Sequence, residues 1–217
     1  MKFYLSLLSI LFTACFSVAQ NTSVFSLGLD NIKQRANTGD MDAMVTLGDY
    51  YFNGVMVEKD SKIALSWYEK AANKGSVDAM YNTAVCYSRL QNGNGSDEKA
   101  FEYFTKAADK GHSIAQYNLA ACYINAIGTK RDMIKAYYYF SLASKDIPDA
   151  EDKVKDLAKR MPAKDLATAK TLVKKSQLNV DDKKLHSDNK DSSTSTDAKN
   201  GESMNQKDMR PDDAFEL

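Results

Sequence analysis

The three segments AMVTLGDYY (residues 43–51), AMYNTAVCY (79–87) and AQYNLAACY (115–123) begin 36 residues apart, since 79 − 43 and 115 − 79 are both 36. Each segment starts with alanine and ends with tyrosine, and no insertion or deletion separates one from the next. A fixed period of this length indicates a repeat architecture in which every unit is one supersecondary motif.

A second shared pattern follows each segment. Alanine recurs at 64, 100 and 136, an aromatic pair at 67–68, 103–104 and 139–140, and alanine again at 71, 107 and 143. This spacing puts the apolar residues on one face of a helix. Asn53-Gly54 predicts the end of the first helix, and Asp60 or Ser61 predicts the N-cap of the second. A single hairpin cannot bury both of its faces, so it must stack on its neighbours. The sequence therefore predicts an all-α fold, an α-solenoid in which antiparallel helix hairpins form a right-handed superhelix.

The pattern resembles the Sel-one-like repeat (SLR), a relative of the tetratricopeptide repeat. The family pattern is carried in full by the first unit, at Ala43, Leu47, Gly48, Tyr51, Ala64, Trp67, Tyr68, Lys70, Ala71, Ala72 and Gly75. The second unit departs from the pattern at Thr83 and Ala84, and the third at Ala120, Ser144 and Ile147. The resemblance covers residues 27–147 and implies a scaffold that binds other proteins.

The N-terminus predicts export. Residues 1–19 have a basic start, an apolar stretch and small residues before the expected cleavage site after Ala19, which are the features of a signal peptide. Alternatively Cys15 is lipidated, in which case the protein is a lipoprotein held at a membrane. The expected location is the periplasm or the medium outside the cell, with membrane attachment only through Cys15.

The remaining boundaries follow from the loss of the period. Residues 20–38 are predicted to be a linker and a capping half-repeat, residues 39–147 the three repeats, and residues 148–177 two C-terminal capping helices. Residues 178–217 are almost wholly polar and predict a disordered tail, with the apolar end AFEL (214–217) as a short docking motif or a frayed terminus.

Several kinds of chemistry find no support in the sequence. Basic and acidic residues balance at 29 each, which gives no electrostatic case for nucleic acid. Neither His112 nor His186 has partners at metal-ligand spacing, so we expect no metal, no cofactor, no small-molecule substrate and no catalytic residue.

The cysteines bear on one enzymatic alternative. Cys86 and Cys122 occupy equivalent positions on successive first helices, whose axes lie too far apart for a disulfide, so we expect two buried, reduced thiols. A cysteine-rich branch of the family, to which β-lactamase or penicillin-binding activity is attributed, carries a disulfide within each hairpin, and this chain lacks those pairs. The matches SDEK (96–99) and SDN (187–189) keep that alternative open, but no KTG follows.

The resemblance also places the partner site. In tetratricopeptide-like stacks the first helices line a concave groove, and the positions expected to face it are Val45, Tyr81, Tyr117, Thr46, Asn82, Asn118, Asn53, Arg89 and Asn125. We predict that Tyr81, Asn82, Arg89, Tyr117 and Asn118 contact a protein or peptide partner. Asparagine offers donors and an acceptor to a peptide backbone, and arginine can bind a carboxylate. The alternative is that the Tyr-Asn pairs only fix hairpin packing.

The aromatic column gives a further expectation. Trp67, Tyr103 and Tyr139 are expected on the same helical face as the alanines at 64, 100 and 136, which predicts that they are core residues. The function that the sequence favours is an exported protein–protein interaction scaffold rather than an enzyme, and a secreted effector that binds host proteins is a variant of the same mechanism.

Overall fold

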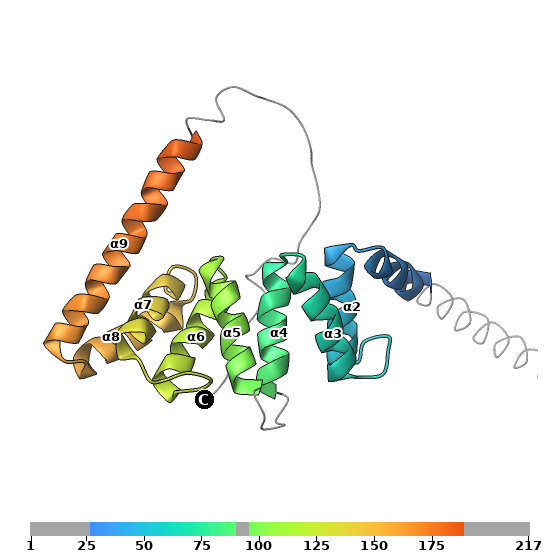
Figure 1. Cartoon of the computed structure of the whole chain (residues 1–217), viewed down its shortest axis with the longest axis horizontal. Coiled ribbons are helices and arrows are strands. Elements are labelled where there is room, and N and C mark those ends of the chain that lie inside the picture. Colours follow the sequence, from blue (N-terminus) through green and yellow to red (C-terminus); the bar gives the residue numbers. More distant parts are fainter. Residues whose placement is uncertain (1–26, 90–95, 189–217) are drawn as a thin grey trace, which may run out of the picture. The chain divides into compact units, whose positions relative to one another are not determined.

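The structure, a computed structural model, describes residues 27–89 and 96–188, with side chains as far as residue 178 (Figure 1). The helices in chain order are one over residues 27–37, α2 (Met41–Asn53), α3 (Ser61–Asn73), α4 (Val77–Arg89), α5 (Ser96–Asp109), α6 (Ser113–Asn125), α7 (Met133–Ala143), α8 (Pro148–Arg160) and α9 (Ala163–Asp188). No strand occurs within these ranges. The predicted all-α fold of successive helix hairpins is confirmed. The chain forms two compact units, one ending at Cys86 and one beginning at Tyr87.

The ends of the helices lie where the polar residues predicted them. Asp60 caps α3 by accepting from the backbone N–H groups of Lys62 and Ile63. Gly54 ends α2 in the left-handed conformation, with φ of 74°. In the third repeat Asp132 caps α7 in the same way as Asp60 caps α3. These caps satisfy backbone groups that a helix end leaves without partners.

A close approach of two helices organises the first unit. A Cβ atom on Gly48 of α2 would lie 2.5 Å from Cε1 of Tyr68 on α3, so the missing side chain is what lets the Tyr68 ring pack there. Tyr68 and Ala64 then form one buried cluster with Cys86 of α4. The first hairpin and the helix that follows it therefore share a core.

In the second unit the helices pack in sequence. Helix α6 contacts both α5 and α7, and α7 in turn contacts α8 and α9. The loop after α6 lies against the start of α5, because a Cβ on Gly128 would overlap the carbonyl oxygen of Asp97. Among the described residues of this unit, Leu119 is completely buried and Phe140 is 2% exposed.

The aromatic pairs correct one expectation. Trp67, Tyr103 and Tyr139 are only half-buried, so the prediction that they are core residues is wrong. The buried member of each pair is the next residue, and Tyr68, Phe104 and Phe140 are each 2% exposed. The reason is helical geometry. The buried ring lies four residues after the buried alanine, on the same face of its helix. The other ring lies three residues after that alanine and points to the side of this face, where it remains partly exposed.

Two helices, α8 and α9, occupy the region where capping helices were expected. Helix α9 continues to Asp188, past residue 178, where the sequence placed the start of the polar tail. Three other predictions lie outside the described residues: the signal peptide over 1–19, lipidation at Cys15, and the end of the tail, including AFEL (214–217).

Candidate functional site

The polar centre of the first unit is the carboxylate of Asp49 on α2. The Tyr68 hydroxyl donates to Oδ1 of Asp49 at 2.6 Å, and Nδ2 of Asn82 donates to the same oxygen at 3.4 Å. Burial raises the pKa of the Asp49 carboxyl above its ordinary value, the Tyr68 hydrogen bond opposes this rise, and the charge of Asp78 adds to it. We call Asp49, Tyr68 and Asn82 the Asp49 cluster.

Two of the predicted groove residues lie on α4 in this unit, and the structure gives both an internal position. Tyr81 is buried, with 3% of its surface exposed. Asn82 is half-buried and its amide is bound to Asp49, so it links α4 to α2. These two placements agree with the packing alternative that the sequence left open, and they leave part of the Asn82 side chain accessible.

The other predicted groove residues belong to the second unit. Arg89, the last residue of α4, is exposed. Tyr117 on α6 is half-buried and its ring meets that of Phe140 edge to face, with 5.0 Å between centroids. Asn118 is 2% exposed, and among the described residues neither its Nδ2 nor its Oδ1 has a hydrogen-bond partner.

The unpartnered amide of Asn118 is explained by the repeat register. Moving each member of the Asp49 cluster forward by 36 residues gives Val85, Phe104 and Asn118. Valine and phenylalanine side chains have no hydrogen-bonding group, so the sequence repeats the asparagine without repeating the carboxylate and the hydroxyl of the Asp49 cluster. A buried amide that lacks its hydrogen bonds costs about 1–3 kcal/mol. Asn118 is therefore a buried amide that the described residues leave without a hydrogen bond.

The remaining positions expected to face the groove vary in exposure. Val45 and Thr46 are half-buried, and Thr46 Oγ1 donates to the backbone carbonyl of Asp42 at 2.8 Å. Asn53 and Asn125, each the last residue of its helix, are exposed. These positions add polar surface at the helix ends but bring together no group that resembles a catalytic centre.

His112 has a role that the sequence did not reveal. Its Nδ1 accepts a hydrogen bond from the backbone N–H of Ala115 at 3.1 Å, so the imidazole is the N-cap of α6. The signal was its place one residue before the helix, at the register of the capping residue Ser76.

The largest feature that sequence reasoning missed is a set of tyrosine pairs with lysines over their rings. Tyr87 and Tyr103 stack with 5.9 Å between centroids, and Lys99 and Lys106 lie 4.9 and 4.5 Å from the centroids of Tyr87 and Tyr103 respectively. One repeat later Tyr123 and Tyr139 stack at 6.0 Å, with Lys135 placed 5.1 Å from the Tyr123 centroid. Contacts of a cation with an aromatic face contribute about 0.5–1 kcal/mol at exposed sites. The signal was present in the sequence, because Lys99 and Lys135 are 36 residues apart.

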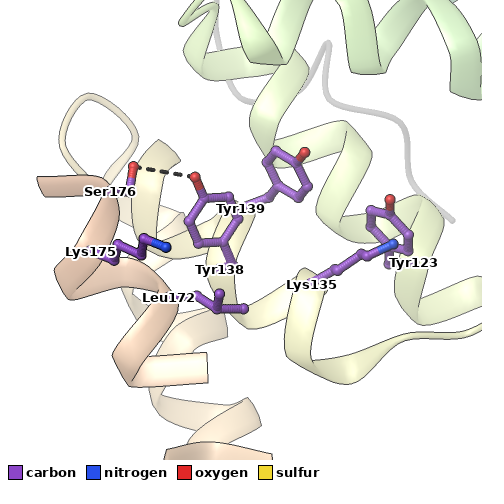
Figure 2. A pocket seen from close by; sticks show the side chains of 7 residues that line it. All are labelled: Tyr123, Lys135, Tyr138, Tyr139, Leu172, Lys175 and Ser176. Carbon is purple, nitrogen blue, oxygen red and sulfur yellow. Dashed lines mark hydrogen bonds between the residues drawn. The ribbon is translucent and has the colours of Figure 1, made fainter. Parts of the chain in front are cut away.

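The second of these pairs borders a hollow of about 400 Å³ at the contact of α7 with α9 (Figure 2). Its lining consists of Tyr123, Lys135, Tyr138, Tyr139, Leu172, Lys175 and Ser176. The Tyr138 hydroxyl donates to Ser176 Oγ at 3.2 Å across the hollow, which fixes α9 to α7. We call this the lysine–tyrosine pocket; its lining contains two lysines and no acidic residue.

A second hollow of about 330 Å³ shares the walls of Tyr138, Tyr139 and Ser176 with the lysine–tyrosine pocket. Its own lining includes Asp109, Lys145 and Asp146, and Asp146 accepts a hydrogen bond from the Ser113 hydroxyl. The two hollows therefore differ in charge, since the first is lined by two lysines and no carboxylate and the second by two carboxylates and one lysine.

Three observations bear on the chemistry that the sequence left open. Within residues 27–89 and 96–188, no group of His, Cys, Asp and Glu side chains could hold a metal ion. In the same ranges no helix combines the length and apolarity needed to cross a membrane. Lys99, of the SDEK match, donates to the Tyr87 hydroxyl at 3.4 Å.

Cys86 and Cys122 are both buried, and neither forms a disulfide. Burial raises the pKa of the Cys122 thiol to about 12, with a further contribution from the charge of Asp97. A thiol with such a pKa is almost wholly protonated at neutral pH and is a poor nucleophile.

Comparison with known proteins identifies the repeat. Residues 42–76, 77–112 and 113–146 each match the family described as Sel1 repeat. A crystal structure of a Sel1 repeat protein from Oxalobacter formigenes superposes with a TM-score of 0.53 and 27% identity, over 59% of this chain and 98% of that one. A protective antigen of uropathogenic Escherichia coli that displays an SLR fold is 23% identical and has a TM-score of 0.46, over 81% of this chain and 45% of the antigen.

One curated relative is the secretory immunoglobulin A-binding protein EsiB of Escherichia coli O6:H1, which is 32% identical over 66 residues. The match covers 30% of this chain and 14% of that protein, so it spans about one repeat pair of a much longer relative.

Helix hairpins that follow one another at a fixed period, with the caps and buried alanines described above, define an α-solenoid repeat protein. Together with the three matched segments, they make this chain a Sel1-repeat protein. Proteins of this kind are generally non-catalytic scaffolds of the type that mediates protein interactions.

Proposed function

We propose that this chain is an exported scaffold that binds a protein or peptide partner through the first helices of its repeats. The observation that carries the proposal is the run of three Sel1 repeats over residues 42–146, since proteins of this kind generally mediate protein interactions. Among the predicted contact residues, Arg89 is exposed, and Asn82 and Tyr117 are half-buried, so these three offer surface to a partner. A partly accessible asparagine can bind both the N–H and the C=O of a partner's backbone, and tyrosine adds apolar area at low entropic cost.

Export is part of the same proposal and rests on residues 1–19. The immunoglobulin-binding relative from Escherichia coli supports a role outside the cytosol only by analogy, because the match covers 14% of it. Mass measurement of the mature protein tests export directly: loss of residues 1–19 supports the signal peptide, and an acylated Cys15 supports the lipoprotein alternative. A full-length chain retained in the cytosol would contradict both.

The test of partner binding uses two asparagines that share a register but differ in their contacts. Affinity capture with the mature chain, followed by mass spectrometry, first identifies the partner. Asn118→Leu should then leave the free energy of unfolding unchanged or higher, because no internal hydrogen bond is lost. A fall in affinity of tenfold or more would show that this side chain, 2% exposed in the free chain, becomes accessible to the partner. Asn82→Ala should lower stability, because it removes the contact with Asp49.

Asn73 provides the matched control, since it is an exposed asparagine at the end of α3, away from the proposed positions. Asn73→Ala should change neither stability nor affinity. Full affinity in the combined variant Asn82→Ala and Asn118→Ala, with the fold intact, would remove these residues from the site.

A further inference from the structure

The lysine–tyrosine pocket has a charge and a shape that single out one kind of occupant. Lys175 on α9 is exposed, and among the described residues it forms no ion pair. Lys135 on α7 lies over the Tyr123 ring and has only a long ion pair, 3.8 Å, with Asp132. The two ammonium groups therefore lie at a hollow whose lining offers them no carboxylate, which favours an acidic ligand.

The apolar part of the lining adds a second requirement. The rings of Tyr123 and Tyr139 and the side chain of Leu172, which is 41% exposed, give the pocket an apolar wall. The neighbouring hollow is lined by two carboxylates, Asp109 and Asp146, against the single lysine Lys145, so the lysine–tyrosine pocket is the more favourable of the two for an acidic ligand. The matching ligand is a short peptide that carries carboxylates next to an aromatic or aliphatic side chain.

The chain itself contains a segment with this chemistry. Residues 211–217 have the sequence PDDAFEL, with three carboxylates at Asp212, Asp213 and Glu216, no basic residue, and the apolar side chain of Phe215. This segment lies outside the described residues. Its composition complements the pocket in both charge and apolar surface.

The length of the intervening chain allows this segment to return. From Lys175 to Asp188 helix α9 advances 13 residues, which corresponds to about 20 Å. The number of residues between Asp188 and Pro211 (189–210) is 22, and a flexible chain of that length has a root-mean-square span of about 26 Å. A linker whose span matches the distance to be covered gives an effective concentration on the order of 1 mM. We propose that residues 211–217 dock in the lysine–tyrosine pocket of their own chain, with carboxylates against Lys135 and Lys175 and Phe215 against the tyrosine rings.

This docking is independent of the groove proposed above, because it concerns α7, α9 and the tail alone. In this arrangement the pocket is a site for acidic peptides that the chain's own tail occupies. Another acidic segment would bind there only in competition with the tail.

The first experiment is zero-length carbodiimide cross-linking of the full mature chain, read by mass spectrometry. Lys175 and Lys135 should be joined to Asp212, Asp213 or Glu216 in preference to Lys106. Lys106 is the matched control, since it also lies over a tyrosine ring and is 46% exposed but is outside the pocket. Tail cross-links spread evenly over the lysines would overturn the proposal. In an equal mixture of light and heavy isotope-labelled chains, cross-links between light and heavy would instead assign the pocket to a second copy.

The second experiment measures binding of a fluorescent peptide with the sequence of residues 207–217. The receptor is the full chain carrying Asp212→Asn, Asp213→Asn and Glu216→Gln, which leaves the pocket open. This variant should bind the peptide about tenfold more tightly than the wild-type chain, whose own tail competes at an effective concentration on the order of 1 mM.

Adding Lys135→Glu and Lys175→Glu to the receptor should abolish binding, whereas Lys106→Glu should not, with the fold checked by circular dichroism. Equal binding by the wild-type and tail-substituted chains would show that the tail does not occupy the pocket. Binding that survives the two pocket substitutions would show that the peptide binds elsewhere.

Discussion

The Asp49 cluster allows a stability prediction in which one repeat serves as the reference for another. Tyr68→Phe removes only the hydroxyl that donates to Asp49 at 2.6 Å. A hydrogen bond to a charged group contributes about 1.5–3 kcal/mol, and the contact from Asn82 at 3.4 Å is too long to replace it. We expect Tyr68→Phe to lower the free energy of unfolding by about 2 kcal/mol.

Asp49→Val alone should cost a similar amount, because it leaves the Tyr68 hydroxyl and the Asn82 amide buried without their acceptor. The double variant Asp49→Val and Tyr68→Phe reproduces the apolar pair Val85 and Phe104 of the second repeat. The double variant should therefore lower the free energy of unfolding by much less than the sum of the two single variants, with a coupling free energy of about 2 kcal/mol.

The assay is urea unfolding at pH 7, followed by far-ultraviolet circular dichroism for the wild type and the three variants. Tyr51→Phe is the control: Tyr51 is half-buried and packs against the buried cluster that contains Tyr68, and the structure gives its hydroxyl no partner among the described residues. Its loss should stay within about 0.5 kcal/mol. Additive single losses, or a Tyr68→Phe loss as small as that of the control, would refute the view that Asp49, Tyr68 and Asn82 act as one unit.

Three further predictions follow from burial. The pKa of the Asp49 carboxyl, measured by NMR titration, should lie above the ordinary aspartate value because of desolvation, and Tyr68→Phe should raise it further. Because the folded-state pKa is raised, the stability that this group contributes is fully present below the ordinary pKa and is lost as the pH rises through the folded-state pKa. A measured pKa at or below the ordinary value would contradict the burial of Asp49. Phe104→Ala should lower the free energy of unfolding, measured in urea, by about 3–5 kcal/mol, as for other buried aromatic truncations. Tyr103→Ala should lower it by clearly less. The reverse order would show that Tyr103, and not Phe104, is the core residue. Cys122 should react slowly with alkylating reagents in the native chain at pH 8, because burial raises its thiol pKa to about 12. When the mature chain is unfolded without reductant, thiol titration should count two free thiols. A count of zero would mean that Cys86 and Cys122 are oxidised.

The sequence predicted the repeats well, because their limits depend on local interactions. Asp60 as a helix cap and Gly54 as a left-handed helix end are consequences of single side chains and could be identified without a structure. The faces of the helices were harder to assign. Neighbouring aromatic residues differ by 100° around a helix, and the register of the alanines did not decide which of Trp67 and Tyr68 was buried.

The candidate site was less predictable for a related reason. Asn82 and Asn118 each follow a tyrosine at the same register, but one is bound to Asp49 and the other has no partner among the described residues. The register of Asp49 is occupied by Val85 in the next repeat, which a comparison of the asparagines alone cannot reveal. The lysine–tyrosine pocket depends on α9 crossing α7, and no repeat pattern in the sequence encodes that contact.

The Asp49 cluster also restricts how such an array can change in length. At the register of Asp49 the following repeats have Val85 and Ala121, and at the register of the asparagines α8 has Val154. If the second and third repeats were deleted and the first joined directly to α8, a carboxylate would face a hydrocarbon side chain and lose its amide donor. Duplication of the second repeat leaves no carboxylate facing a hydrocarbon, although it adds one more asparagine in the situation of Asn118. We therefore expect natural or engineered lengthening of this array to occur after the first repeat. The polar residues of the first repeat require the asparagine of the second repeat to follow them, so the first repeat cannot exchange places with another.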